Sequence, residues 1–360
     1  MLDADGFARL RLIRTASVGP VAFSQLLARF GSAQAALDAI PDLARRGGGS
    51  SPRIAALADA QREAEAVARA GGFYLFSGRP DYPALLAEAE GAPPVLMVSG
   101  DPALLARPAV AMVGARNASA AAVRFARQLA VELGQLGYVV VSGLARGIDT
   151  AAHQGALDSG TVGVVASGLD IAYPPENEPL QRMMQTRALV VTEQPPGIEP
   201  HARHFPARNR IIAGLALGTL VVEAAPKSGS LITARLAADY GREVMAVPGS
   251  PLDPRAQGCN QLIRDGATLI QSAEDVAEAL RPFGRDRVAA PAEGFIPGAL
   301  TDVGDRDRDT LLALLSPVPV ALDELLRQSG LAPAAMHLVL LEAELAGRLE
   351  RHAGGRVSLR

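Results

Sequence analysis

Apolar residues recur at helical spacing over the first 70 residues of the chain. Phe7–Ile13 and Phe23–Leu27 each place them three and four positions apart, which is typical of one buried helix face. A Gly-Pro turn follows Ser17, and Ser32 stands where it could cap the next helix. The pattern predicts an N-terminal helical domain over residues 1–70.

The order helix, glycine turn, helix in this domain is similar to a helix-hairpin-helix repeat, which can bind a DNA backbone through the amides of its turn. The flanks of the Ser17–Pro20 turn contain no lysine and few arginines. A small helical packing domain is therefore slightly favoured over a DNA-binding one.

The pattern changes in the middle of the chain. Residues 71–104 are rich in proline and predict an extended approach segment with a short strand over 94–98. From there to residue 283, short β-branched runs alternate with helical stretches. Nearly continuous apolar strands separated by helices predict an α/β domain over 105–283, a Rossmann-like doubly wound parallel sheet. The strands are expected at 109–113, 138–141, 161–166, 189–192, 219–222 and 243–247, with a weak one at 268–270.

The C-terminal part predicts a linker and a last small module. Residues 284–300 contain glycine and proline and read as the linker. Helical patterns over 305–315, 321–329 and 333–346 precede alternating residues around Gly354-Gly355. Three helices and a terminal hairpin predict a winged-helix domain over 301–360.

Composition and charge exclude several classes of protein. The 360 residues are 49% hydrophobic and carry 35 basic against 38 acidic side chains, for a net charge of −3. An uncharged apolar run of about 18 residues, as a membrane span needs, is not present, and the acidic start differs from a signal peptide. The single cysteine, Cys259, excludes an internal disulfide and a cysteine-cluster metal site. We expect a cytoplasmic protein without a membrane association.

Two of the predicted strands are followed by glycine-containing loops that open helices. Gly114 and Arg116 follow the first strand, and Ser142, Gly143 and Arg146 follow the second. Backbone amides at a helix start favour an anion, and an arginine adds a charge-assisted contact to phosphate. Only Gly114 of a Gly-x-Gly-x-x-Gly motif is present, which disfavours a dinucleotide cofactor.

Further along, Asp149 and His153 lie four residues apart on one predicted helix. They could form a metal or acid–base pair, but we favour a hydrogen bond between them that fixes the loop, because no third ligand or nucleophile is near in sequence. His201 and His204 similarly give only a weak indication of zinc.

Basic residues also follow the later strands. Arg203–Gly218 contains three arginines and no acid, and includes Arg208, Asn209 and Arg210 beside an aromatic residue, a pattern that suits a nucleic-acid backbone. The only lysine, Lys227, stands with Ser228 and Ser230 in a loop that opens a helix. Several anion-receptive loops along one edge of a sheet favour a polyanion over a single nucleotide.

These motifs together resemble the DNA-processing protein A family, also called Smf. The resemblance covers about residues 105–283 in the family's order. It rests on Val113–Arg116, Ser142–Asp149, Phe205–Ile212, Ser228–Ala234, Ala246–Gly249 and Gly258–Ile263.

The resemblance implies a homodimeric, single-stranded-DNA-binding recombination mediator, which protects incoming DNA and loads the RecA recombinase during natural transformation. It places a DNA-contacting arginine at Arg116 and a basic pocket at Arg208, Arg210 and Lys227 with Ser228 and Ser230. We expect no enzymatic activity, no cofactor and no metal, because the sequence contains no catalytic constellation, no dinucleotide-binding motif and no cysteine cluster. The predicted third helix of the winged helix, residues 333–345, carries no basic residue, which argues against major-groove readout.

Two other functions remain open from the sequence. Rossmann-like nucleoside-monophosphate phosphoribohydrolases have a similar layout, but they use a Pro-Gly-Gly-x-Gly-Thr loop and a catalytic glutamate. Here the corresponding stretch is Ser228–Thr233, with no acid before Asp239. The other possibility is a structural adaptor for RecA, which absence of DNA binding by residues 105–283 would favour.

Overall fold

The structure is a computed structural model that describes residues 2–285, 303–352 and 354–360. The chain divides into two compact units. One contains the residues up to Arg62 together with the described residues from Val303 onward, and the other runs from Glu63 to the end of helix α12. The division falls within α4 (Leu57–Arg69).

The first unit joins the two ends of the chain. Its N-terminal part is helical as predicted, with α1 (Ala4–Arg14), α2 (Pro20–Phe30) and α3 (Ala33–Arg46). Asp3 and Ser32 cap α1 and α3 through hydrogen bonds to backbone amides.

The C-terminal part of this unit has the elements of a winged helix in the predicted order. They are α13 (Asp305–Ala313), β10 (Val320–Ala321), α14 (Leu322–Ser329), α15 (Pro333–Leu345), β11 (Leu349–His352) and β12 (Arg356–Leu359). The three strands form a sheet in the order β10-β12-β11. The predicted linker lies almost wholly outside the described residues.

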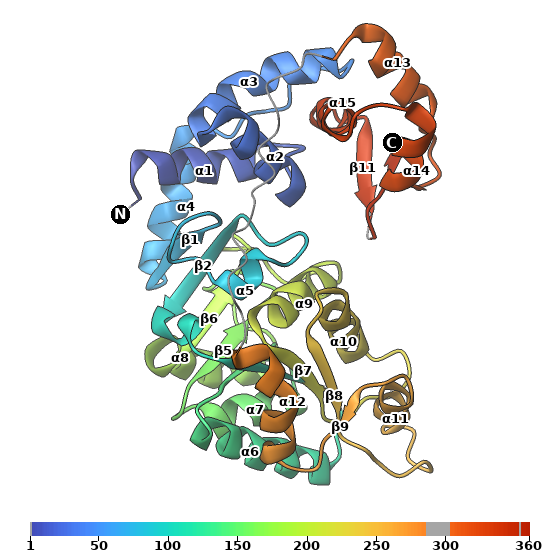
Figure 1. The fold of residues 1–360 in the computed structure, drawn as a ribbon. Helices are drawn as coiled ribbons and strands as arrows, with labels where there is room; N and C mark the ends of the chain where they lie inside the picture. The colour runs from blue at the N-terminus through green and yellow to red at the C-terminus, as the bar shows by residue number, and fades with distance from the viewer. Residues whose placement is uncertain (1, 286–302, 353) are drawn as a thin grey trace. The chain divides into compact units, whose positions relative to one another are not determined.

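The second unit is built on a nine-stranded sheet in the order β1-β2-β6-β5-β4-β3-β7-β8-β9 (Figure 1). All neighbouring strands from β6 to β9 are parallel. The parallel strands are β3 (Ala109–Val113), β4 (Val139–Ser142), β5 (Thr161–Val164), β6 (Leu189–Thr192), β7 (Gly218–Val221), β8 (Glu243–Ala246) and β9 (Thr268–Leu269). Each matches a predicted strand to within two residues at either end.

The approach segment is more regular than predicted. β1 (Gly72–Phe76) and β2 (Val95–Gly100) pair with each other in antiparallel register, and β2 also pairs with β6. The prolines that suggested irregular structure lie mostly in the long connection between these strands, where the short helix α5 (Ala84–Ala87) forms. Because the prolines stand outside β1 and β2, they remove no ladder hydrogen bond. This segment therefore adds two strands to the sheet.

Helices cover the sheet on both faces. α6 (Ala120–Gln135), α7 (Ile148–Ala156) and α12 (Ala273–Arg285) share one apolar core with strand residues such as Val110 and Leu220. The connection from β5 to β6 through α8 (Glu178–Arg187) steps across the sheet in the same direction as the connections through α6 and α7. The later connections, through α9 (His204–Leu215), α10 (Gly229–Asp239) and α11 (Gln257–Arg264), step in the other direction. Right-handed crossovers therefore place these three helices on the opposite face of the sheet from α6 and α7 (Figure 1). The fold is the predicted doubly wound α/β domain.

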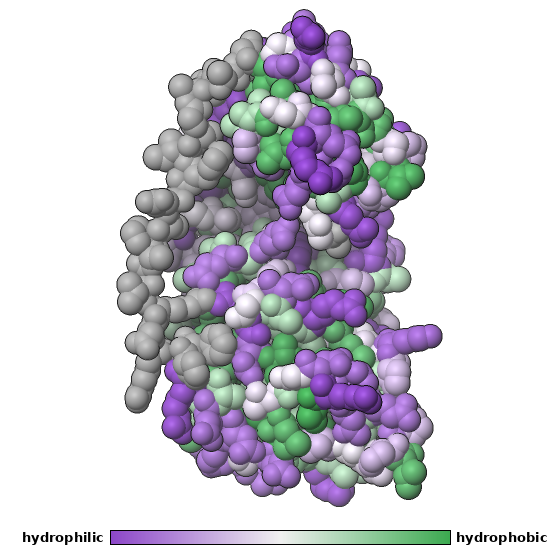
Figure 2. Space-filling model, turned by 45° about the vertical axis from the view of Figure 1, so that its right-hand side comes forward, coloured by the Kyte–Doolittle hydropathy of each residue, from purple (hydrophilic) through white to green (hydrophobic). Residues whose placement is uncertain are grey.

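Surface hydropathy is mixed. On the face shown in Figure 2, apolar residues form small groups between polar ones, as is usual on the surface of folded proteins. Within the described residues, every helix is too short or too polar to cross a membrane.

Candidate nucleic-acid interface

A pocket lies where the strand order reverses. β3 continues to β4 on one side, whereas β7, β8 and β9 extend the sheet on the other. Ligands of doubly wound sheets bind at such a switch point, beyond the carboxyl ends of the strands. A cavity of about 540 Å³ opens here between the loops after β3 and β7 and the start of α9. We call it the β3–β7 pocket.

The β3–β7 pocket collects many of the predicted site residues. Those that line it are Gly114, Arg116, Arg208, Asn209, Lys227, Ser228 and Ser230. They come from three loops or helix starts that are far apart in sequence, so the fold brings together what the motifs only suggested. Their role in binding DNA stays a prediction.

Arg208 is buried beneath the pocket rather than exposed at its mouth. It is 6% exposed. Its Nη1 donates to the carbonyl oxygens of Gly143, at 2.6 Å, and of Val164. Burial lowers the pKa of Arg208 to about 10, and the Asp149 carboxylate opposes that shift. The guanidinium therefore stays charged at neutral pH and ties the ends of β4 and β5 to α9.

Asp149 lies next to Arg208 and holds the loop after β4. Its Oδ2 accepts hydrogen bonds from the amides of Gly143, at 3.1 Å, and Ala145, at 3.3 Å. Burial raises the pKa of Asp149, and the charge of Arg208 opposes the rise together with the two amide hydrogen bonds. We call Gly143, Asp149 and Arg208 the floor of the pocket.

His153 supports this floor from below in its neutral form. The ring Nε2 accepts from the amide of Leu144 at 3.3 Å, and Nδ1 lies 2.8 Å from Thr161 Oγ1. Because Thr161 Oγ1 donates to the carbonyl of Val140, the proton between the ring and Thr161 belongs to Nδ1. Burial lowers the pKa of His153 to about 3, with a further contribution from Arg208.

The expected hydrogen bond between Asp149 and His153 is replaced by separate contacts to the same loop. Asp149 bonds to the amides of Gly143 and Ala145, and His153 to that of Leu144. The favoured interpretation, that both residues fix the loop, agrees with this geometry.

The mouth of the pocket carries an exposed cation on an aromatic ring. The Arg116 guanidinium lies 5.1 Å from the centroid of the Phe205 ring, a cation–π distance. Tyr173 packs at a tilt against the Phe205 ring, with ring centroids 5.6 Å apart. Arg116 is exposed, so charge and aromatic surface face solvent together.

Lys227 is the second exposed cation of the mouth. Its backbone has a φ of 68°, in the left-handed region that costs a non-glycine residue about 1 kcal/mol. The next residue, Ser228, caps α10, and its Oγ lies 2.8 Å from that of Ser230. Asn209 donates from Nδ2 to the carbonyl of Gly229 at 3.3 Å and links α9 to this loop. We call Arg116, Phe205 and Lys227 the rim of the pocket.

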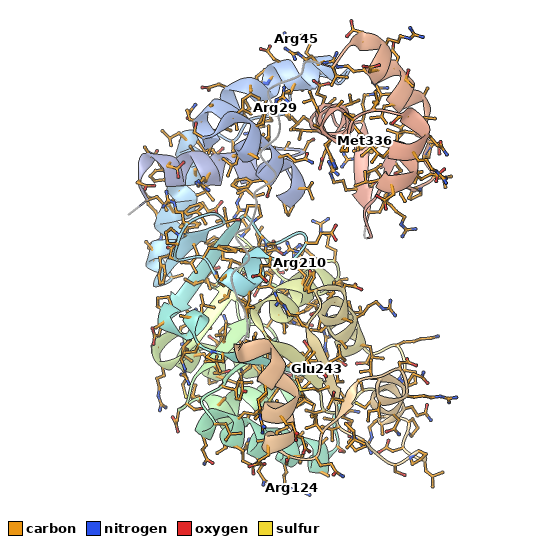
Figure 3. The ribbon with its side chains drawn as sticks, in the orientation of Figure 1. Arg29, Arg45, Arg124, Arg210, Glu243 and Met336 are labelled. Carbon is orange, nitrogen blue, oxygen red and sulfur yellow. The ribbon has the colours of Figure 1, made fainter. Side chains whose placement is uncertain are left out.

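Four predicted residues lie outside the lining of the pocket. One of them, Gly143, belongs to the floor, where its carbonyl accepts from Arg208. Ser142 is buried and donates to the carbonyl of Met112. Arg146 is exposed and lies 3.9 Å from Glu176. Arg210, labelled in Figure 3, pairs with Glu193 at 2.5 Å, and both side chains are only 18% exposed. The pairing offsets the positive charge that the sequence suggested for Arg210.

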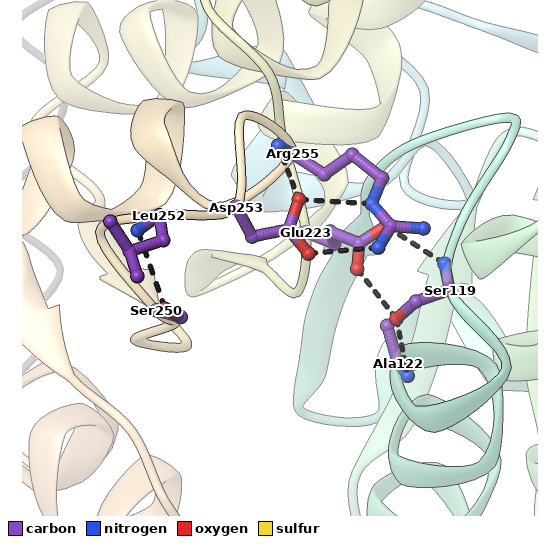
Figure 4. Close-up of polar contacts among 7 residues, drawn as sticks. All are labelled: Ser119, Ala122, Glu223, Ser250, Leu252, Asp253 and Arg255. Carbon is purple, nitrogen blue, oxygen red and sulfur yellow. Dashed lines mark hydrogen bonds and ion pairs between the residues drawn. The ribbon is translucent and has the colours of Figure 1, made fainter.

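The start of α6 is also less open than the sequence indicated. Glu223, at the end of β7, accepts from the amide of Ser119 at 3.0 Å and from its Oγ at 2.7 Å (Figure 4). Ser119 in turn caps α6 by accepting from the amide of Ala122. A carboxylate of the chain itself thus occupies the helix N-terminus where a phosphate would bind in a nucleotide-binding member of this fold.

No metal site emerges from the described parts of the chain, where no group of three or more potential ligands comes together. His201 and His204 contact each other edge to face, with ring centroids 5.2 Å apart. The amide of His201 donates to Nδ1 of His204. Burial, with a smaller contribution from His201, lowers the pKa of His204.

Phe205 in the pocket lining, and Tyr173 and Glu223 beside it, were not named as site residues from the sequence. Phe205 could have been found, because it stands directly before the Arg208–Arg210 run. Tyr173 and Glu223 come from a loop and a strand end with no motif that marks them. Their contacts to Phe205 and Ser119 depend on how strands that are distant in sequence pair in the sheet.

Comparisons with known proteins agree with the architecture. The model of the family "DNA recombination-mediator protein A" matches residues 73–281. Models of a "DprA-like N-terminal HHH domain" and a "DprA winged helix domain" match residues 3–66 and 296–355. The DNA processing protein DprA of Streptococcus pneumoniae is 47% identical over 197 residues, which cover 54% of this chain and 70% of that protein. The protein Smf of Synechocystis is 35% identical over 320 residues, 80% of each chain.

Solved structures give the same result. The crystal structure of DprA from S. pneumoniae matches with a TM-score of 0.58 and 42% identity, covering 61% of this chain and 77% of that one. A structure of DNA processing protein A from Helicobacter pylori, described in terms of its single-stranded DNA binding mode, matches with a TM-score of 0.53 and 30% identity. It covers 57% of this chain and 95% of that one.

Proposed function

The chain belongs to the DNA recombination-mediator protein A family, and from this membership we propose that it binds single-stranded DNA in the β3–β7 pocket. One observation carries the proposal: the exposed cations Arg116 and Lys227 flank the same pocket, and the Phe205 ring lies under one of them. Cations track a phosphate backbone, and an aromatic ring offers a stacking surface that every base can use.

The arrangement favours binding without turnover. Asp149, which lines the pocket, is already engaged by backbone amides, and Glu223 at the start of α6 is engaged by Ser119. A general acid or base needs to reach a substrate proton. We therefore propose that the protein holds DNA rather than hydrolyses nucleotides.

Affinity for oligo-dT against salt concentration tests the proposal. Each phosphate contact to a single strand contributes about −0.7 to the slope of log K against log salt. We expect a clearly negative slope and weaker binding to a duplex of equal length. A flat slope or a preference for duplex would refute the proposal, and release of free base from a nucleoside monophosphate would favour the phosphoribohydrolase.

Arg116→Ala locates the site, with Arg124→Ala as its matched control. Both arginines are exposed, but Arg124 lies on α6 outside the pocket lining. Arg116→Ala should weaken oligo-dT binding and make the salt slope less negative by about 0.7, while Arg124→Ala should behave like the parent protein. Equal effects would place the DNA elsewhere.

We further propose that the protein acts as a homodimer in the cytoplasm and passes its DNA to RecA. Family membership supports these proposals, and apolar surface on the second unit supports the dimer. Leu269 on the edge strand β9 is 45% exposed and Leu252 is 93% exposed. An exposed strand edge with apolar side chains is a common place for self-association. Sedimentation of the parent protein and of Leu269→Asp tests the dimer, and the rate of RecA filament assembly on oligo-dT tests the transfer.

A further inference from the structure

The third helix of the winged helix is buried. In helix-turn-helix proteins the corresponding recognition helix enters the major groove of DNA. In α15 the buried side chains lie all around the axis, as in a helix enclosed by protein. They belong to Met336, Leu338, Val339, Leu340, Leu341, Glu342, Ala343 and Leu345. Figure 3 labels Met336 at the N-terminal end of this helix.

The N-terminal helices supply much of what covers α15. One apolar core contains Leu26 and Leu37 of α2 and α3 together with Leu340 of α15, and α15 packs against α3 (Figure 1). These elements are about 300 residues apart in sequence but belong to the same compact unit.

The glycines after α3 show how closely the backbones approach. Gly47 has a φ of −71°, which any residue can adopt, so its backbone does not require glycine. A Cβ at this position would collide with the carbonyl oxygen of Glu342. A Cβ at Gly49 would lie 2.5 Å from the carbonyl oxygen of Ala346. Glycine is needed at both positions because the end of α15 passes there.

The turn before α2 faces an acid of α15. Gly19 caps α2 without a side-chain hydrogen bond, so the helix start is the type of site that favours an anion. The Glu344 carboxylate lies beside it, with Oε1 3.9 Å from where a Cβ of Gly19 would be. Glu344 is largely buried and pairs with Arg351 at 2.7 Å. The place beside this turn is thus taken by an acid of the same chain, whose charge Arg351 offsets.

We propose that α15 is a docking helix for the N-terminal helices of the same chain, and that DNA contacts neither α15 nor the start of α2. The helix-hairpin-helix turn and the winged helix cover each other's nucleic-acid-binding elements. DNA contacts are then confined to other surfaces of the protein, which goes beyond the function proposed for the β3–β7 pocket.

Hydrogen exchange of the full chain with and without oligo-dT or duplex DNA tests this directly. We expect DNA to slow amide exchange in the loops at 114–119 and 227–230 at least tenfold. Exchange at 19–23 and 333–345 should stay within twofold of the free protein. Protection of either of these last two segments would overturn the proposal, whereas protection at neither pocket loop would count against the proposed function.

Gly47→Ala tests the docking without DNA. The added methyl should separate the two backbones and raise amide exchange over 333–345 at least tenfold. Gly304→Ser is the matched control, because a Cβ at Gly304 meets no other atom within 4 Å and serine suits its N-cap position. Exchange in Gly47→Ala like that of the control would overturn the docking.

The same two variants complete the test with DNA. We expect both to bind oligo-dT within twofold of the parent protein, because the β3–β7 pocket is unchanged. More than tenfold weaker binding by Gly47→Ala alone would show that the docked helices contribute to DNA binding, and would refute the proposal.

Discussion

The floor and the rim of the β3–β7 pocket use basic side chains in opposite ways. Arg208 in the floor is buried and gives its hydrogen bonds to the carbonyls of Gly143 and Val164. Lys227 in the rim is exposed, on a backbone held in the left-handed region. Basic residues of one motif set therefore divide into those that build a binding surface and those that present charge on it.

Arg208→Ala should have the largest effect, and the effect should be on folding. The substitution leaves two buried carbonyls without a donor and removes the cation nearest to buried Asp149. Loss of one member of such a buried set costs about 3 kcal/mol. Urea denaturation at pH 7 measures it, with exposed Arg203→Ala as the control.

The contrary result for Arg208 is equally clear. If Arg208→Ala unfolds at the same urea concentration as the parent protein but loses affinity for oligo-dT, then Arg208 acts as a rim residue. The distinction between floor and rim would then be wrong for Arg208, the residue whose hydrogen bonds define the floor.

Acid should weaken the floor through His153. Its pKa is about 3 in the folded protein against 6.5 for an ordinary histidine, so between these values only the unfolded chain binds the proton. Stability is then fully present above pH 6.5 and falls as the pH drops towards 3, by up to about 1.4 kcal/mol per pH unit.

A histidine variant isolates this contribution. Asp149 and Arg208 also face the site, and the raised pKa of Asp149 acts in the opposite direction; both are retained in His153→Gln. We expect the unfolding free energy of His153→Gln to fall less steeply between pH 6.5 and 4.5 than that of exposed His201→Gln. Parallel curves for the two variants would show that His153 does not titrate as its burial requires.

Lys227 should affect binding rather than folding. Loss of one charge-assisted phosphate contact weakens binding about tenfold, with the salt slope less negative by about 0.7. Lys227→Gly should also gain up to about 1 kcal/mol of stability, because glycine adopts a φ of 68° without strain. Titration of oligo-dT and thermal unfolding measure the two effects, and Lys227→Arg should retain the slope. Unchanged binding by Lys227→Gly would remove Lys227 from the rim.

Much of the sheet could be predicted from the sequence because parallel strands are buried on both faces and read as short apolar runs. β3 and β6 appear at their predicted residues. β1 could not be predicted, because its place in the sheet depends on pairing with β2 across a proline-rich connection.

Prediction of the candidate site was less complete for a related reason. Sequence spacing placed Arg208 and Arg210 in one basic run, but successive side chains on a helix point in different directions. Arg208 therefore enters the floor, and Arg210 pairs with Glu193 outside the pocket. Which strand end supplies a partner such as Glu223 depends on strand order, which no local pattern specifies.

Glu223→Gln should have the smallest effect. It tests the difference between two helix starts at the same edge of the sheet. The start of α6 is covered by the Glu223 carboxylate, whereas α10 begins beside Lys227. In Glu223→Gln the side chain can still accept from Ser119, but the negative charge at the helix N-terminus is lost. A charge in this position contributes about 0.5 kcal/mol, so urea denaturation should show a loss of that size. Binding of oligo-dT should keep the parent's salt slope, because the DNA is expected at the rim. A slope more negative by about 0.7 would mean that Glu223 normally keeps a phosphate away from α6, and that both helix starts can hold the strand.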